Sequence, residues 1–170
     1  MSTECYISKA HNLMGDMLAL TAIENIGKYL VRAVRDGSDL EAREGVAFAN
    51  NLSGQVMTVS ACTSEHSMEH AMSAYHQELP HGAGLIMISV AYYQHFIDCH
   101  VCDERFVAMA KALGKADAST FWMCWYGFRR TAAWQTLKCP TLAFRKASWM
   151  SWLGTPVRRW RAVWGRSLRT

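Results

Sequence analysis

The first 120 residues of this 170-residue chain predict an all-α fold, a bundle of packed helices. Apolar residues recur there every three or four positions, which is the spacing of one helix face. Capping and turn residues divide the segment into pieces of helical length. No alternation of apolar and polar residues typical of strands competes with this pattern. With 51% hydrophobic residues, the chain is large enough to bury one core.

The first long helix is expected to begin at Asp16. Its apolar positions fall three or four apart and so line one face: Leu20, Ile23, Ile26, Leu30 and Val34. The helix runs into Asp36-Gly37, where glycine can adopt the left-handed conformation that ends a helix.

A capping box predicts the start of the second helix. Ser38 and Glu41 have the spacing at which the serine oxygen and the glutamate each satisfy free N–H groups of the first turn. The helix continues through Ala42, Val46, Ala49, Leu52 and Val56. Its small residues predict close contact with neighbouring helices: Ala47, Ala49, Ser53 and Gly54.

Three shorter helices are expected to complete the bundle. One covers about Ser64–Tyr75 and the next covers Gly82–Phe96, with Pro80 suited to its first turn. The last covers Asp103–Leu113 and is stopped by Gly114.

Three cysteines are considered as redox or metal-binding residues. Cys99 and Cys102 form a single CxxC, but no second pair at zinc-finger spacing accompanies them, so a helix boundary is favoured over a redox or zinc site. Cys62 is interpreted as a small buried residue.

Histidines gather in residues 65–82, which hold four of the seven: His66, His70, His76 and His81. On a helix, His66 and His70 project from one face, and a tight loop could bring His81 back toward them. Neutral imidazoles suit divalent iron, zinc, nickel or copper. A single helical histidine is more often a surface or core residue, whereas this cluster favours a metal site. Glu65 and Glu69 could orient its histidines, although a solvated helix face is the ordinary role of such residues.

Four runs along residues 2–118 resemble the iron-containing (group III) alcohol dehydrogenases. They are Glu4-Cys5-Tyr6-Ile7-Ser8, the stretch from Asp16 to Glu24, the stretch from Asp36 to Arg43, and His66…His70…Pro80-His81-Gly82. The resemblance implies an N-terminal α/β domain that binds a nicotinamide dinucleotide. It also implies an all-helical C-terminal domain with one divalent metal, Fe or Zn, held by an aspartate and three histidines. That metal polarises the substrate oxygen while hydride passes between the carbinol carbon and the cofactor.

The same resemblance implies roles for individual residues. His66 and His81 correspond to metal ligands, and His70 to the catalytic-site histidine that faces the nicotinamide. The interval from His66 to His81 is one residue longer than the family pattern, so His70 is an alternative ligand to His66. Met1 occupies the histidine position of the family's Asp-x-x-x-His motif, which would place the aspartate upstream.

No cofactor-binding residue is identified, because no glycine-rich phosphate loop follows a predicted strand. We therefore expect the chain alone to be inactive. NAD(P) and a small alcohol or aldehyde would bind only in the intact parent enzyme.

Charge divides the chain sharply at about residue 120. Residues 1–120 hold all 14 acidic residues and 8 basic ones, so their net charge is 8 − 14 = −6, whereas residues 121–170 carry +10. All seven tryptophans lie in the second part and all seven histidines in the first. Arginines and indoles in such a tail could bind nucleic acid or an anionic membrane surface.

A shifted reading frame explains the tail more simply. In the shifted frame, each codon consists of the last base of one residue's codon and the first two bases of the next residue's codon. Read in this way, residues 121–126 give Leu-Asp-Val-Leu-Val for every synonymous choice of codons. The next residues can be read as an amphipathic helix resembling what the family carries at this point. We therefore divide the chain into a partial helical metal-binding domain at 1–118 and an irregular, out-of-frame tail at 119–170.

Partners and compartment follow from the same observations. The sequence shows no secretory signal, no membrane span and no disulfide framework, so a cytoplasmic location without membrane or nucleic-acid partners is expected. A homo-oligomer is compatible with the sequence. The alternatives are a non-catalytic helical module whose basic tail binds nucleic acid or an anionic surface, and a module completed by a separate nucleotide-binding chain.

Overall fold

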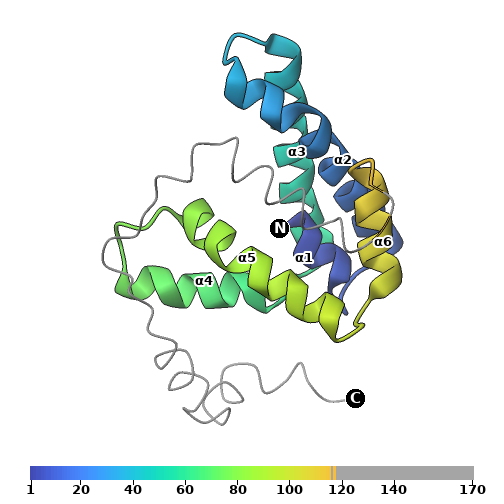
Figure 1. Cartoon of the computed structure of the whole chain (residues 1–170), viewed down its shortest axis with the longest axis vertical. Helices are drawn as coiled ribbons and strands as arrows, with labels where there is room; N and C mark the ends of the chain where they lie inside the picture. The colour runs from blue at the N-terminus through green and yellow to red at the C-terminus, as the bar shows by residue number, and fades with distance from the viewer. Residues whose placement is uncertain (116, 118–170) are drawn as a thin grey trace. The chain divides into compact units, whose positions relative to one another are not determined.

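The computed structural model describes residues 1–115 and 117, and within them the fold is entirely helical (Figure 1). The all-α prediction is therefore confirmed. The helices are α1 (Ser2–Ile7), α2 (Leu13–Arg35), α3 (Leu40–Val59), α4 (Ser64–Tyr75), α5 (His81–Asp98) and α6 (Asp103–Ala112). None of these helices is long and apolar enough to cross a membrane. The predicted tail at 119–170 lies outside the described residues.

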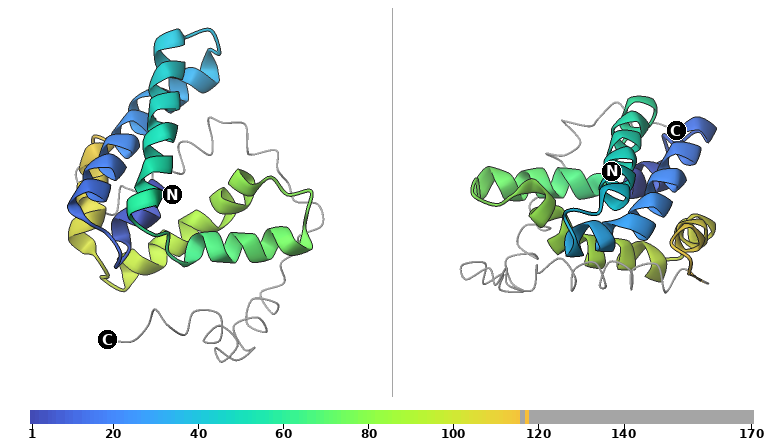
Figure 2. Two further views of the ribbon diagram at one scale, coloured as in Figure 1. Left: turned by 180° about the vertical axis from the view of Figure 1, so that it is seen from behind. Right: turned by 90° about the horizontal axis from the view of Figure 1, so that it is seen from above.

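Helices α2 and α3 form a long antiparallel pair, seen side by side in both views of Figure 2. Gly45 of α3 packs against Tyr29 of α2, where an added Cβ would lie 2.2 Å from Cδ2 of Tyr29. Ala49 is buried in the same interface, as its small size predicted. Gly54 is different, because an added Cβ there would meet nothing within 4 Å. The prediction of close contact at Gly54 is therefore wrong.

The starts of α2 and α3 differ from the predicted ones. Helix α2 begins at Leu13, three residues before Asp16, because the side chain of Asn12 accepts a hydrogen bond from the Gly15 N–H at 2.9 Å. Helix α3 is capped by Asp39, which accepts from the Ala42 N–H at 3.0 Å, so the predicted capping box is wrong.

The turn between α2 and α3 also differs from expectation. Ser38 donates both its N–H and its hydroxyl to Asp36, whose extended backbone ends α2. Among the described residues Gly114 is the glycine with a positive φ (70°), so the left-handed conformation expected at Gly37 is absent. Gly114 does follow α6, as predicted.

Helix α1 was not predicted, and every one of its residues is buried. Cys5, Tyr6 and Ile7 belong to one core cluster with side chains from α2, α3, α5 and α6. The guanidinium of Arg105 on α6 reaches the Tyr6 carbonyl and pairs with Asp16 at 3.0 Å. A short helix that is marginal alone is thus held by burial on several sides.

The CxxC segment is a helix boundary, as predicted. Cys99 ends α5, and Cys102 precedes α6 with a left-handed backbone (φ 64°). Helices α4 and α5 form a second antiparallel pair, with Pro80 as the N-cap of α5 rather than a residue of its first turn (Figure 1).

Candidate metal centre

The pairing of α4 with α5 brings three histidines together. His66 and His70 lie one turn apart on α4, and His81 is the first residue of α5. Their ring centroids are 6.3 Å apart for His66–His70, 5.5 Å for His66–His81 and 5.6 Å for His70–His81. His76 is the C-cap of α4, and its Nδ1 lies 4.0 Å from a Glu78 oxygen. The structure therefore groups the three histidines that the sequence singled out.

A buried carboxylate holds His81. Glu69 is fully buried on α4, and its Oε2 accepts a hydrogen bond from His81 Nδ1 while its Oε1 accepts one from Ser73 at 2.6 Å. Gly84 makes room for it, since a Cβ there would lie 2.8 Å from Glu69 Oε1. Burial opposes ionisation, but the hydrogen bonds from Ser73 and His81 keep the pKa of Glu69 below its ordinary value.

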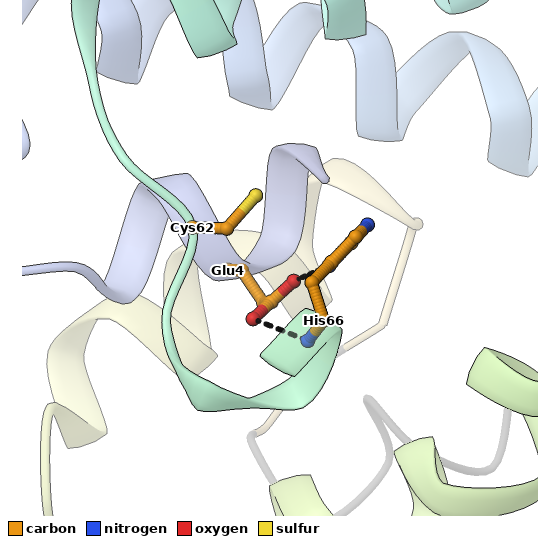
Figure 3. Close-up of side chains that lie close together, drawn as sticks. All are labelled: Glu4, Cys62 and His66. Carbon is orange, nitrogen blue, oxygen red and sulfur yellow. Dashed lines mark hydrogen bonds and ion pairs between the residues drawn. The ribbon is translucent and has the colours of Figure 1, made fainter. Parts of the chain in front are cut away.

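A second buried carboxylate, Glu4 of α1, holds His66 (Figure 3). One oxygen accepts from His66 Nδ1, and the other accepts from the Thr63 hydroxyl at 2.9 Å and the Glu65 N–H at 3.1 Å. The hydrogen bond from the Glu65 N–H satisfies a backbone donor at the start of α4 that has no partner within that helix. Burial opposes ionisation of Glu4, but these bonds hold its pKa below the ordinary value.

The contacts also affect protonation of His66. Contact with the Cys62 sulfur and the hydrogen bond to Glu4 raise the pKa of His66 to about 9. Glu4 was not predicted as a site residue, although it lies within the run that resembles the dehydrogenases.

Glu65 does not orient a histidine. Its carboxylate accepts hydrogen bonds from the hydroxyls of Ser89 and Tyr93, the latter at 2.5 Å, and it is 3% exposed. Desolvation raises the pKa of Glu65. Both proposed roles for this residue, as a histidine partner and as part of a solvated face, are therefore wrong. Glu69 lies one turn away and contacts His81 instead.

Cys62 is half-buried and lies beside both Glu4 and His66 (Figure 3). Its Sγ is 3.9 Å from the Sγ of Cys5. The S–H···S contact lowers the pKa of Cys5 to about 7 against the opposing effect of burial.

Within residues 1–115 and 117, two groups of side chains have donor atoms within 4.8 Å of one another and could hold a metal ion: Glu4, Cys62 and His66, and Glu69, His70 and His81. In both groups the carboxylate already binds a histidine Nδ1. An imidazole held through Nδ1 presents Nε2 as the remaining metal ligand, which is the arrangement that protein metal sites use. Figure 3 shows the far ring nitrogen of His66 pointing away from Glu4. Each group therefore offers an imidazole Nε2 with a carboxylate behind it, and the rings of His66 and His81 lie 5.5 Å apart between their centroids.

Fold and site together define a helical domain with a histidine-rich candidate metal centre. Residues 2–122 match the family model described as "Fe-containing alcohol dehydrogenase family, C-terminal". The chain belongs to this family, and the match lies in its C-terminal domain.

Relatives and solved structures agree with this assignment. The chain is 32% identical over 116 residues to the 1,3-propanediol dehydrogenase of Klebsiella pneumoniae, covering 67% of the chain and 29% of that protein. It is 32% identical over 119 residues to the NAD-dependent methanol dehydrogenase of Bacillus methanolicus, covering 66% and 29%. A crystal structure of an archaeal halo-thermophilic alcohol dehydrogenase from a Red Sea brine pool superposes with a TM-score of 0.72 at 33% identity. That match covers 77% of this chain and 35% of the other, so the chain spans about a third of its relatives' length.

Proposed function

We propose that this chain carries the helical, metal-binding part of an NAD(P)-linked alcohol dehydrogenase, with His66 and His81 as ligands of a divalent ion. The observation that carries the proposal is the pair of buried carboxylates on Nδ1 of these two histidines, whose rings lie 5.5 Å apart. A bound ion would act as a Lewis acid toward an alcohol or carbonyl oxygen.

The protein's own side chains have distinct tasks in this proposal. Glu4 and Glu69 fix the ring orientation and tautomer of His66 and His81. Their negative charge makes the Nε2 of each imidazole a stronger ligand for the metal. His66 is favoured over His70 as a ligand because it is 9% exposed and hydrogen-bonded to Glu4. His70 lies on the exposed side of the cluster with its ring stacked at 30° to that of His81, where it would face the nicotinamide.

The substrate class and the cofactor are inferred from the relatives, whose names state that they act on 1,3-propanediol and, with NAD, on methanol. We infer that the 170 residues alone do not turn over an alcohol. The support is that residues 1–115 and 117 form only helices, whereas dinucleotide-binding folds present the pyrophosphate to a glycine-rich loop between a strand and a helix. Purified chain supplied with Zn²⁺, NAD and 1,3-propanediol should form no NADH, and steady NADH formation would contradict this inference.

Metal binding tests the main proposal. Titration of the full chain with Co²⁺, followed by visible absorption, should show one ion per chain. His66→Gln and His81→Gln should each weaken binding by about tenfold or more, because each removes a ligand. His95→Gln is the matched control, since His95 is exposed on α5 away from the cluster. Equal binding by all four proteins, or no binding by the unmodified chain, would refute the proposal.

A further inference from the structure

Cys5 and Cys62 are neighbouring thiols that have no part in the proposed dehydrogenase chemistry. The two thiols come from α1 and from the connection between α3 and α4, and they are separated by 57 positions in the sequence. Their sulfurs are nevertheless 3.9 Å apart, so each is the hydrogen-bonding neighbour of the other. We propose that Cys5 and Cys62 are a redox modification site, oxidised by peroxide to a reversible disulfide.

Solvent reaches the pair of thiols from the side of Cys62. Cys5 is 1% exposed, whereas Cys62 is half-buried at the edge of the core. An oxidant therefore reaches Cys62 first, and Cys5 is held behind it in position to resolve the product. A disulfide needs the two sulfurs to approach to about 2.05 Å, a closure of roughly 2 Å from their present separation. Rotation of two short side chains and small backbone shifts supply such a movement.

The chemistry balances with one equivalent of hydrogen peroxide. The Cys62 thiol gives up its proton as its sulfur attacks one peroxide oxygen, the O–O bond breaks, and the released hydroxide takes up that proton and leaves as water. The Cys5 sulfur then attacks Cys62 Sγ, the S–O bond breaks, and the second hydroxide leaves as water with the Cys5 proton. Two thiols lose two electrons, and peroxide is reduced to two molecules of water.

The bond would tie together the segments that form the carboxylate–histidine contact. Cys5 directly follows Glu4, and Cys62 directly precedes Thr63, which donates to the same carboxylate. Oxidation would therefore fix α1 against the start of α4 beside His66. Because the cross-link closes a long loop, it should also stabilise the fold against unfolding.

Among the described residues, Cys99 and Cys102 provide an internal comparison. Cys99 and Cys102 flank the turn between α5 and α6, and the Cys99 sulfur lies 3.8 Å from His95 Nδ1. Cys99 is exposed, so it should react with peroxide readily. A generic reaction of accessible thiols would modify Cys99 first, whereas a specific redox site links buried Cys5 to half-buried Cys62.

Peptide mapping of the full chain tests the proposal. The protein is treated with hydrogen peroxide, remaining thiols are blocked, and a non-reducing digest is analysed by mass spectrometry. The expected result is a Cys5–Cys62 linked peptide, about 2 Da lighter than the two thiol peptides together and lost on reduction. The link should persist in Cys99→Ser and be absent in Cys62→Ser.

A melting experiment provides a second readout. Oxidation should raise the thermal midpoint of the unmodified chain by roughly 5 °C or more and leave that of Cys62→Ser unchanged. Recovery of Cys5 as a free thiol while Cys62 is oxidised to sulfinic acid, or linkage of either residue to a different cysteine, would overturn the proposal. Because the mapping uses the unmodified chain, it decides the question even if a variant fails to fold.

Discussion

Glu69 lies behind His81 with both of its oxygens engaged by hydrogen bonds. Replacing it with glutamine keeps the shape but removes the negative charge that aligns and strengthens the imidazole. We predict that Glu69→Gln lowers the affinity for Zn²⁺, measured by isothermal titration, by about tenfold to a hundredfold. Glu44→Gln is the matched control, since Glu44 is exposed on α3. Unchanged affinity in Glu69→Gln would mean that this carboxylate has no role in binding.

The contact between His66 and Glu4 predicts a pH dependence in the metal-free chain. The pKa of His66 in the fold is about 9, above the ordinary value of 6.5, so its stabilising effect is complete below pH 6.5. That contribution is lost as the pH rises from 6.5 through about 9. Urea unfolding in the presence of a chelator should therefore show stability falling over this interval. In His66→Gln the fall should be smaller, and an identical fall in both proteins would contradict the prediction.

The three histidines were predicted with Glu65 and Glu69 as possible partners, and of these two only Glu69 contacts a histidine. Glu65 and Glu69 occupy equivalent positions one turn apart on α4, and the sequence could not distinguish them. Their partners depend on where α5 packs: Glu65 meets Ser89 and Tyr93, and Glu69 meets His81. Glu4 was missed for a similar reason, because its histidine lies 62 positions away on another helix.

At the scale of helices, the long periodic elements were predicted best. Helices α2 to α6 each appear close to the expected ranges, since an amphipathic face several turns long is visible in the sequence. The six-residue helix α1 is too short to show such a period, and its stability comes from burial among residues distant in sequence. The cap at Asn12 lies four residues before the predicted start at Asp16, and the cap at Asp39 lies one residue after the predicted cap Ser38.

The packing of α2 against α3 predicts opposite effects for two glycines of one helix. Gly45→Ala should destabilise the chain, because its Cβ would lie 2.2 Å from the Tyr29 ring, whereas Gly54→Ala meets open space. Gly54→Ala should stabilise by about 1 kcal/mol, the difference in helix propensity. Chemical denaturation of both variants provides the comparison. Stabilisation by Gly45→Ala equal to that by Gly54→Ala would show that the helices are less closely packed than the structure indicates.

At the scale of the whole molecule, the described helices present apolar side chains that would suit further contacts. Leu13 is 90% exposed and Leu40 is 79% exposed. We predict marginal stability for the isolated chain, with a broad thermal transition that moves to higher temperature as Zn²⁺ is added. Calorimetry with and without the metal is the measurement. A sharp cooperative transition whose midpoint is the same with and without Zn²⁺ would contradict both the marginal stability and the stabilisation by metal binding.

The charge boundary near residue 120 concerns the chain as a whole. Net charge changes from −6 to +10 across this point, and the family match ends at residue 122. The shifted-frame explanation stays a prediction, which resequencing of the coding DNA through codons 118–121 would test.

The central claim is that one divalent ion binds the Nε2 atoms of His66 and His81, with Glu4 and Glu69 behind them. X-ray absorption at the zinc edge of the Zn²⁺-loaded full chain tests this claim most directly. An ion held in this way has a first shell of nitrogen and oxygen at about 2.0–2.1 Å with imidazole scattering beyond it. A sulfur at about 2.3 Å would contradict the claim, because it would place the ion at Cys62 instead.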